Sequence, residues 1–468
     1  MDQPEPHPPS FETKPVEIAE PTPQETLLTR RIHMLGLGSI GTLIAHSLRC
    51  LPNPPPLTLL LHKAEMYEEF KSKSRIIRLI NKQNDINDEQ TGFDVDLLEK
   101  DPVTGLAKWT FIPDRPDPRG KPTNPVSEEE TLDSGELYIY SLIVTVKGPA
   151  TVAALRSVKH RVNAQTTICL VQNGLGQVDE LNREVFTDPQ TRPTYMLGII
   201  SHGAHLAGSF TVIHAGFGTV ALGIYRDTDK YPLPPKTATP NISNLPENER
   251  KRLYPTDQEL FSNLSSRYIL RTLTRAPVLT CAAFPYLDLF QLQLEKLSTN
   301  AVLNPITALL NVPNGAMLYN GALSTVQRLL LAEISLVIRG LPELEGLPNV
   351  RVRFSPERLE KLFLSVSSKT AQNSSSMRED VRHGKNTEID YINGYIVKRG
   401  EERGLKCVLN YMLMQLVKGK SWYQMNAEEA SIPYGVSRVQ GELQPDAVGG
   451  PGSVIIDDQS TPAKGEIQ

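Results

Sequence analysis

The sequence predicts an α/β protein in which a doubly wound sheet is followed by an all-helical domain. Strand-like apolar runs alternate with amphipathic helical segments from residue 31 to about residue 226, which is the pattern of parallel sheets. From about residue 255 the apolar spacing becomes helical. The predicted parts are a disordered tail (1–30), the α/β domain (31–226), an inserted loop (227–254), the helical domain (255–435) and a second disordered tail (436–468).

The composition is that of an ordinary globular protein with enough apolar material for real cores. Of its 468 residues, 39% are hydrophobic and 22% are charged. A net charge of -4 and a pI near 6.2 give no reason to expect nucleic acid or an anionic membrane as a partner. We also expect no membrane span, because we find no apolar run that is long enough and sufficiently free of charge to cross a bilayer.

The N-terminal tail and the cysteines bear on the compartment. Residues 1–30 are acidic and rich in Pro, and they show neither the apolar core of a secretory signal nor the Arg-rich pattern of a mitochondrial presequence. The four cysteines are far apart and form no Cys-x-x-Cys pair, so we expect reduced core residues. These features predict a cytoplasmic protein, with a mitochondrial location as the alternative, and no metal site.

The ordered chain begins with a glycine turn between a short strand and a helix, RIHMLGLGSIGTLIAHSLRC at 31–50. The spacing is G-x-G-x-x-G. The first glycine permits the tight turn, the second lets a pyrophosphate approach the backbone, and the third lets the helix pack on the strand. A chance glycine turn is the alternative, but a second strand at 57–61 favours a dinucleotide-binding, Rossmann-type domain. The predicted cofactor-binding residues of this loop are Gly36, Leu37, Gly38, Ser39, Ile40 and Gly41.

The end of the second strand bears on the choice of cofactor. An acidic residue there would bind the ribose 2′-hydroxyl of NAD, whereas a basic residue suits the 2′-phosphate of NADP. This chain has His62 and Lys63 at that point, with Glu65 just beyond. We therefore predict NADP, with Lys63 as the phosphate ligand. A surface lysine in a loop is the alternative.

The later strands place two more polar residues at the edge of the sheet where ligands bind. One continuous apolar strand ends at Lys147, and the next closes on Asn173. Ligands of doubly wound sheets bind outside the carboxyl ends of the strands, so both residues are candidates for cofactor contact. The alternative for Asn173 is plain Asn-Gly turn chemistry. The other predicted features are short strands at 92–98 and 108–113, a Pro-rich loop at 113–134, a helix at 150–162 and further strands of the same sheet within 194–225.

Within the helical domain, the stretch EKLSTNAVLNPITALL at 295–310 carries an unusual polar stripe. Lys296, Asn300 and Asn304 fall at i, i+4 and i+8, so they share one face of an otherwise apolar helix. An ordinary solvated face is the alternative to a functional cleft. Because Pro305 follows Asn304, we predict that Asn304 caps a second helix that starts at the proline. Other predicted helices are 324–339, 355–370, 388–404 and 408–418.

A second polar stretch, NSSSMREDVRHGKNTEIDYINGY, lies at 373–395. Its run 373–376 is predicted to cap a helix. Glu388 is predicted to start another helix, where a carboxylate would also complement the helix dipole. Asp380 and Arg382 are predicted to form a structural ion pair.

Together, the motifs GLGSIG, Lys147, QNGLG, EKLSTNAVLNPITAL and SSMREDVRHGKNTEIDYINGY resemble those of the ketopantoate reductase (2-dehydropantoate 2-reductase) family. The last two are specific, whereas the glycine loop is not. The resemblance covers roughly residues 31–430. It implies a Rossmann domain, a helical domain like that of 6-phosphogluconate dehydrogenase, and an active site between them. The activity it implies is NADPH-dependent reduction of ketopantoate to (R)-pantoate, on the route to pantothenate and coenzyme A.

The resemblance also implies individual roles. Lys296 would be the general acid, with a pKa lowered by burial and by another cation, and Glu388 would contact the reacting hydroxyl. The implied substrate-binding residues are Asn300, Asn304 and Ser376 with Asn373 as a neighbour, and the implied cofactor contacts are Lys147 and Asn173.

Two other functions stay open at this point. One is a related NADP-dependent reductase of a different 2-keto acid, and the other is a non-catalytic regulatory relative, since fold does not fix function. The joint presence of Lys296, Asn300, Ser376 and Glu388 favours catalysis. The expected partner is a small 2-keto acid, and a homodimer is the assembly we consider.

Overall fold

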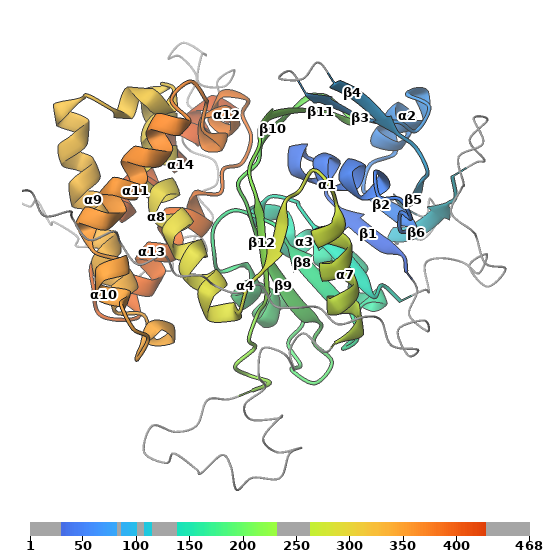
Figure 1. The fold of residues 1–468 in the computed structure, drawn as a ribbon, viewed down its shortest axis with the longest axis horizontal. Helices are drawn as coiled ribbons and strands as arrows, with labels where there is room; N and C mark the ends of the chain where they lie inside the picture. The colour runs from blue at the N-terminus through green and yellow to red at the C-terminus, as the bar shows by residue number, and fades with distance from the viewer. Residues whose placement is uncertain (1–29, 82–85, 101–106, 115–137, 232–262, 427–468) are drawn as a thin grey trace, which may run out of the picture. The chain divides into compact units, whose positions relative to one another are not determined.

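The computed structural model describes residues 30–81, 86–100, 107–114, 138–231 and 263–426 (Figure 1). The predicted tails (1–30 and 436–468) and the loops predicted at 113–134 and 227–254 lie wholly or mostly outside these residues.

The described part of the N-terminal half is built on a nine-stranded sheet in the order β13-β12-β9-β8-β7-β1-β2-β5-β6. Neighbouring strands are parallel except at β5–β6 and β9–β12, which are antiparallel. The order reverses at β1, which pairs with both β2 and β7, as in a doubly wound sheet. The strands are β1 (Ile32–Leu35), β2 (Leu57–Leu61), β5 (Phe93–Lys100), β6 (Ala107–Ile112), β7 (Ser141–Val144), β8 (Thr167–Leu170), β9 (Thr194–Ile200), β12 (Val220–Ile224) and β13 (Cys281–Ala283).

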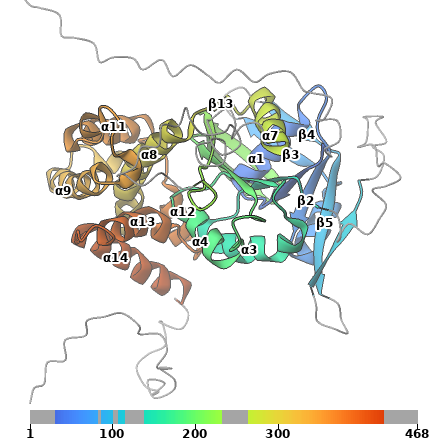
Figure 2. The same cartoon turned by 90° about the horizontal axis from the view of Figure 1, so that it is seen from below.

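Different helices cover the two faces of this sheet (Figure 2). Successive side chains of a strand point to opposite faces, so Ile32 and Met34 of β1 join one apolar core and Leu35 joins another. The first core includes side chains of α1 and α7, and the second includes side chains of α3 and α4. The helices are α1 (Ser39–Arg49), α2 (Ala64–Ser72), α3 (Thr151–Val158), α4 (Gln177–Glu184) and α7 (Leu264–Arg275).

The prediction that 194–225 only extends the main sheet is wrong in part. β9 and β12 join it, but the hairpin β10 (Gly203–Gly208) and β11 (Thr211–Gly216) pairs with β3 (Ile77–Asn81) and β4 (Ile86–Gln90) in a second, four-stranded sheet. The reason lies in α1, where every residue from Gly41 to Leu48 is buried. A helix buried on all sides needs a cover on the side away from the main sheet, and the second sheet supplies it.

The C-terminal part is helical, which confirms the predicted fold class. Its core is formed by α8 (Tyr286–Leu310), α9 (Gly321–Arg339), α11 (Pro356–Lys369), α12 (Ser376–Arg382), α13 (Ile389–Glu401) and α14 (Val408–Met425), with the short α10 (Val350–Arg353) beside them. The predicted start at residue 255 needs correction, because α7 and β13 pack with the sheet. The helical core begins at α8.

The predicted helix break at Pro305 is also wrong, because α8 continues through the proline to Leu310. An interior proline removes one backbone N–H, which leaves the carbonyl of Ala301 without its helical donor. The side-chain amide of Asn393 on α13 donates to that carbonyl at 2.8 Å instead. A tertiary contact therefore replaces the lost helical bond.

By length and composition, α9 could cross a membrane, which corrects the expectation that no such run exists. The same helix packs against α8, α11, α13 and α14 and contributes Leu330, Ile334 and Ile338 to the helical core. Core helices of helical domains often have the same length and composition, so these two properties of α9 are weak evidence for a membrane span.

Candidate active site

The glycine loop has the geometry that a bound pyrophosphate requires. Gly36 has a φ of +102°, and a Cβ there would lie 2.6 Å from the Val146 nitrogen. A Cβ at Gly41 would clash with the Gly36 carbonyl, so this glycine is needed for close packing of α1 on β1. At Gly38, by contrast, a Cβ would meet no described atom within 4 Å. The backbone is open at the point where a phosphate would approach the N-terminus of α1, so these residues fit the predicted group.

The basic pair lies where the sequence predicted it. β2 runs parallel to β1 and ends at Leu61, so the exposed His62 and Lys63 follow the strand next to the glycine loop. Partial burial of its ring, and then the charge of Lys63, lowers the pKa of His62, which favours its neutral form. A 2′-phosphate contact by Lys63 stays a prediction.

Three predicted residues from distant parts of the chain form one hydrogen-bonded series. The Lys296 ammonium donates to Asn173 Oδ1 at 2.9 Å and to the Ile200 carbonyl at 2.7 Å. Asn173 Nδ2 in turn donates to Glu388 Oε2 at 3.2 Å. The other carboxylate oxygen, Oε1, accepts from the Gly148 N–H at 3.1 Å. These partners fix the amide orientation of Asn173, because the flipped amide would set donor against donor.

The electrostatics of this series suit proton transfer. Burial lowers the pKa of Lys296 to about 8, while the Glu388 carboxylate opposes that shift. The prediction that another cation would help lower this pKa is not supported, because burial alone is the lowering cause. Burial also raises the pKa of Glu388, against hydrogen bonds from Gly148 and Asn173. The ammonium has three N–H donors and uses two of them here, so one remains for a bound substrate.

Lys147 connects the two halves of the site in a way the sequence did not predict. It follows β7, and its ammonium forms an ion pair with Asp380 of α12 and donates to the Asn386 carbonyl at 3.4 Å. The predicted pair of Asp380 with Arg382 is therefore wrong. Arg382 pairs with Glu379 instead, since three residues on a helix bring those two side chains to one face. A cofactor contact by Lys147 stays a prediction.

The predicted substrate residues extend from the same helix. Asn300 is partly buried and Asn304 is buried, one and two turns beyond Lys296 on α8. Ser376 opens α12, where the actual cap is Ser375, whose hydroxyl also meets Thr307 of α8 at 2.7 Å. That contact brings the start of α12 to the distal end of the polar stripe.

Asn373 is exposed in the loop before α12, and its carbonyl accepts from the Asn314 N–H. The structure therefore gathers Lys296, Asn173, Glu388 and Lys147 through direct or shared contacts. Among the described residues, no side-chain hydrogen bond joins Asn300, Asn304, the exposed Ser376 or Asn373 to that group. Two groups that sequence reasoning missed are Asp380 and the Ile200 carbonyl. The Ile200 carbonyl could not be predicted, because every residue has a backbone carbonyl. Asp380 was recognised as a charged residue, but its partner Lys147 was not.

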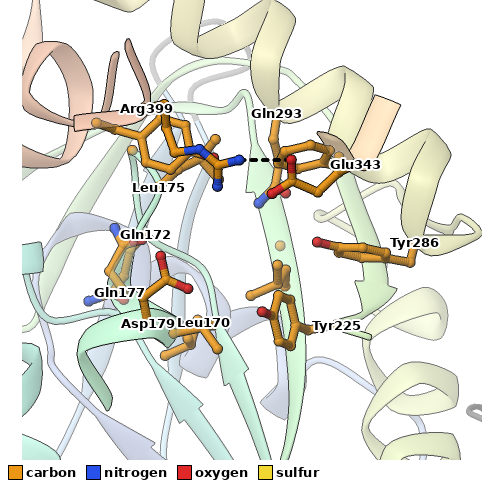
Figure 3. Close-up of a pocket in the computed structure, with 17 residues that line it drawn as sticks. Leu170, Gln172, Leu175, Gln177, Asp179, Tyr225, Tyr286, Gln293, Glu343 and Arg399 are labelled. Atoms are coloured by element: carbon orange, nitrogen blue, oxygen red, sulfur yellow. Dashed lines mark hydrogen bonds and ion pairs between the residues drawn. The ribbon is translucent and has the colours of Figure 1, made fainter. Parts of the chain in front are cut away.

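A cavity of about 70 Å³, lined by both polar and apolar side chains, lies beside this site, between the loop after β8 and helices α8 and α13 (Figure 3). Tyr225 and Tyr286 face it, and Arg399 crosses it to Glu343 in an ion pair of 2.8 Å. Gln172 and its neighbours in the Asn173 loop line it, but Lys296, Asn173 and Glu388 do not. The cavity thus lies behind the loop and is separate from the candidate catalytic groups.

A dinucleotide-type glycine loop on a doubly wound sheet, together with a partly buried lysine from the helical part that follows, is the arrangement of a dinucleotide-dependent oxidoreductase. Comparison with known families agrees with this class. The chain belongs to the ketopantoate reductase family, because residues 32–227 match the model described as "Ketopantoate reductase PanE/ApbA" and residues 288–421 match its C-terminal model. The second match begins close to the start of α8 at Tyr286.

Two relatives and one solved structure illustrate the similarity. The "Probable 2-dehydropantoate 2-reductase" of Schizosaccharomyces pombe is 26% identical over 395 residues, which cover 84% of this chain and 97% of the relative. "Ketoisovalerate reductase BEA2" of Gibberella fujikuroi is 25% identical, over 79% of this chain and 78% of its own. The structure of D-mandelate dehydrogenase with NADH and anilino(oxo)acetate has a TM-score of 0.57 at 17% identity, covering 84% of this chain and 99% of that one. At that identity the likeness concerns the fold alone.

Proposed function

We propose that this protein reduces the 2-keto group of ketopantoate to (R)-pantoate with NADPH, as a step of pantothenate and coenzyme A biosynthesis. The observation that carries the proposal is the series Lys296–Asn173–Glu388, which joins the two matched regions of the family at a partly buried ammonium. Its support also includes the relative in Schizosaccharomyces pombe, which bears the name of this activity.

The cofactor, when bound on the glycine loop, supplies the hydride for the carbonyl carbon. The side chains of the protein supply the proton and position the substrate. Lys296 would donate its free N–H to the carbonyl oxygen and protonate the alkoxide as it forms. Glu388 would accept from substrate hydroxyl groups and, through Asn173, hold the lysine in place. Asn300, Asn304 and Ser376 would bind the other polar groups of the substrate and keep the keto carbon in register with the hydride donor.

The direct test follows NADPH oxidation with a panel of 2-keto acids that includes ketopantoate and ketoisovalerate. The second acid is the competing candidate, since one relative is a ketoisovalerate reductase. It lacks the hydroxyl group of ketopantoate, and a site built to bind that hydroxyl would reject it strongly, by as much as about 10⁴-fold. We expect the highest kcat/KM with ketopantoate. If ketoisovalerate has the higher kcat/KM, it is the substrate in place of ketopantoate, and the reaction is still the reduction of a 2-keto acid.

The pH profile of kcat/KM is expected to fall above about pH 8. A lysine that acts as an acid must be charged, and its charged form is lost as the pH rises through the pKa of about 8 given by burial. Because Glu388 raises this pKa, Glu388→Gln should move the alkaline limb of its residual activity to lower pH. A limb that stays at the same pH in that variant would assign the titration to another group.

Lys63→Ala is expected to weaken binding of NADPH more than binding of NADH, because only NADPH carries the 2′-phosphate. Both cofactors can be titrated by their fluorescence. Lys71→Ala is the matched control, since this lysine is exposed near the other end of α2. Equal weakening of the two cofactors would identify Lys63 as an ordinary surface residue.

A further inference from the structure

Three side chains of the kinds that bind metals meet at the C-terminal end of α1. His46 and Cys50 are one helical turn apart, so they share a face of the helix. Asp88 reaches them from β4, an edge strand of the second sheet. One ligand atom from each residue lies within 4.8 Å of the others. The aspartate is 38 residues from the cysteine, so the cluster is assembled by the fold and has no signature in the sequence.

The distances are close to those between ligands around one tetrahedral metal ion. Cys50 Sγ lies 3.6 Å from His46 Nδ1 and 3.5 Å from Asp88 Oδ2. Metal bonds of about 2.0–2.3 Å at tetrahedral angles place neighbouring ligand atoms about 3.3–3.6 Å apart. The distance from the sulfur to Nδ1 therefore already has the required length, and the carboxylate lies near enough to join once it turns.

The hydrogen bonds of His46 identify the nitrogen that would bind. Nε2 lies 3.2 Å from the backbone carbonyl of Asp88, and a carbonyl can only accept, so Nε2 carries the proton. The lone pair is then on Nδ1, which faces the cysteine sulfur. Imidazole ligands of metals are commonly oriented by such a second hydrogen bond to a carbonyl. The carboxylate of Asp88 lies on the Nε2 side, at 3.3 Å, and is the group that must turn to complete the set.

The side chains of the cluster differ in burial. The His46 side chain is 1% exposed, whereas that of Asp88 is 43% exposed and therefore has room to turn. Gln90 donates to Asp88 Oδ2 at 3.1 Å and orients the carboxylate from outside the cluster.

From this geometry we infer that His46, Cys50 and Asp88 bind a divalent transition metal of the zinc class. A mixed set of imidazole, thiol and carboxylate suits such an ion, whereas magnesium and calcium prefer oxygen ligands alone. The ion would link α1 to the edge strand β4. It would have no part in the reduction, because His46 and Cys50 lie about 10 and 16 Å along α1 from the end of the helix that follows the glycine loop.

The test uses the full-length protein, stripped of metal by a chelator and titrated with Co²⁺. We expect one equivalent to bind, with visible bands of tetrahedral cobalt and a near-ultraviolet band from the cobalt–thiolate bond, and we expect Zn²⁺ to displace it. Cys50→Ser should remove the thiolate band and weaken binding more than tenfold. Cys281→Ser is the matched control, as a second partly buried thiol that lies outside the cluster.

Asp88→Asn gives a second variant at the most exposed ligand, in case Cys50→Ser fails to fold. It should keep the thiolate band but bind Co²⁺ more than tenfold more weakly. Substoichiometric binding, or a thiolate band that survives in Cys50→Ser, would show that the three residues are only a hydrogen-bonded group. Removal of the metal should lower the melting temperature and leave the reductase kcat unchanged, so this result is independent of the proposed activity.

Discussion

Lys296→Ala is expected to lower kcat by about 10²–10⁴-fold, the usual contribution of a positioned general acid. The Lys296 ammonium is the cation that donates directly to Asn173, whereas the nearby ammonium of Lys147 is held in an ion pair with Asp380. NADPH binding should stay nearly unchanged, because the glycine loop lies on the other domain. The variant should also remain folded, since the loss of two hydrogen bonds is offset by removing a buried charge.

Stopped-flow or steady-state assays with ketopantoate give kcat, and cofactor fluorescence gives the affinity for NADPH. Lys361→Ala is a suitable control, because this lysine is exposed on α11 of the same helical domain. If Lys296→Ala keeps most of the wild-type kcat, the assignment of the general acid is wrong. If kcat falls together with NADPH affinity and melting temperature, the lysine has a structural role.

Glu388→Gln is expected to lower kcat/KM for ketopantoate well over tenfold, a loss of more than about 1.4 kcal/mol of transition-state stabilisation. The carboxylate accepts from the Gly148 N–H and from Asn173, and it is buried with a raised pKa. Glutamine keeps one acceptor but turns an N–H₂ group toward one of these donors. Asn173 would then be free to turn, and Lys296 would lose its fixed position.

The melting temperature of this variant should stay close to that of the wild type. One hydrogen bond is lost, but the cost of burying a carboxylate is removed at the same time. Asp390→Asn is the matched control, because Asp390 is an exposed acid in the first turn of the same helix. A fall in melting temperature with unchanged kcat/KM would make Glu388 a helix-start residue that acts only through the dipole.

Much of the candidate site could be predicted from local sequence. The glycine loop is a local structure: the positive φ of Gly36 and the tight packing at Gly41 are set by a few neighbouring residues, which a motif of fixed spacing captures. The polar stripe of Lys296, Asn300 and Asn304 follows from helical periodicity in the same way. The prediction that a helix starts at Glu388 is confirmed, since Glu388 is the N-cap of α13.

Which side chains pair with each other in space could not be predicted from local sequence. Asp380 has a cation two residues away in the sequence, yet it pairs with Lys147 from the other domain. Residues two apart on a helix point in different directions, so the nearest charge in the sequence is not the nearest in space. The second sheet escaped prediction for a similar reason, because strand alternation says which residues are buried but not which strand lies alongside.

The sequence by itself therefore determined the fold class, the glycine loop and the polar face of the helix that carries Lys296. Tertiary structure alone decided how they combine. Lys296 and Asn173 are 123 residues apart, and Asn173 and Glu388 are 215 apart. The unbroken α8 shows the same dependence, because Pro305 is tolerated where Asn393 of α13 supplies the missing donor. Hydrogen bonds between distant segments form only after the domains pack, and local patterns of apolar and polar residues carry no record of which distant donor will meet which acceptor.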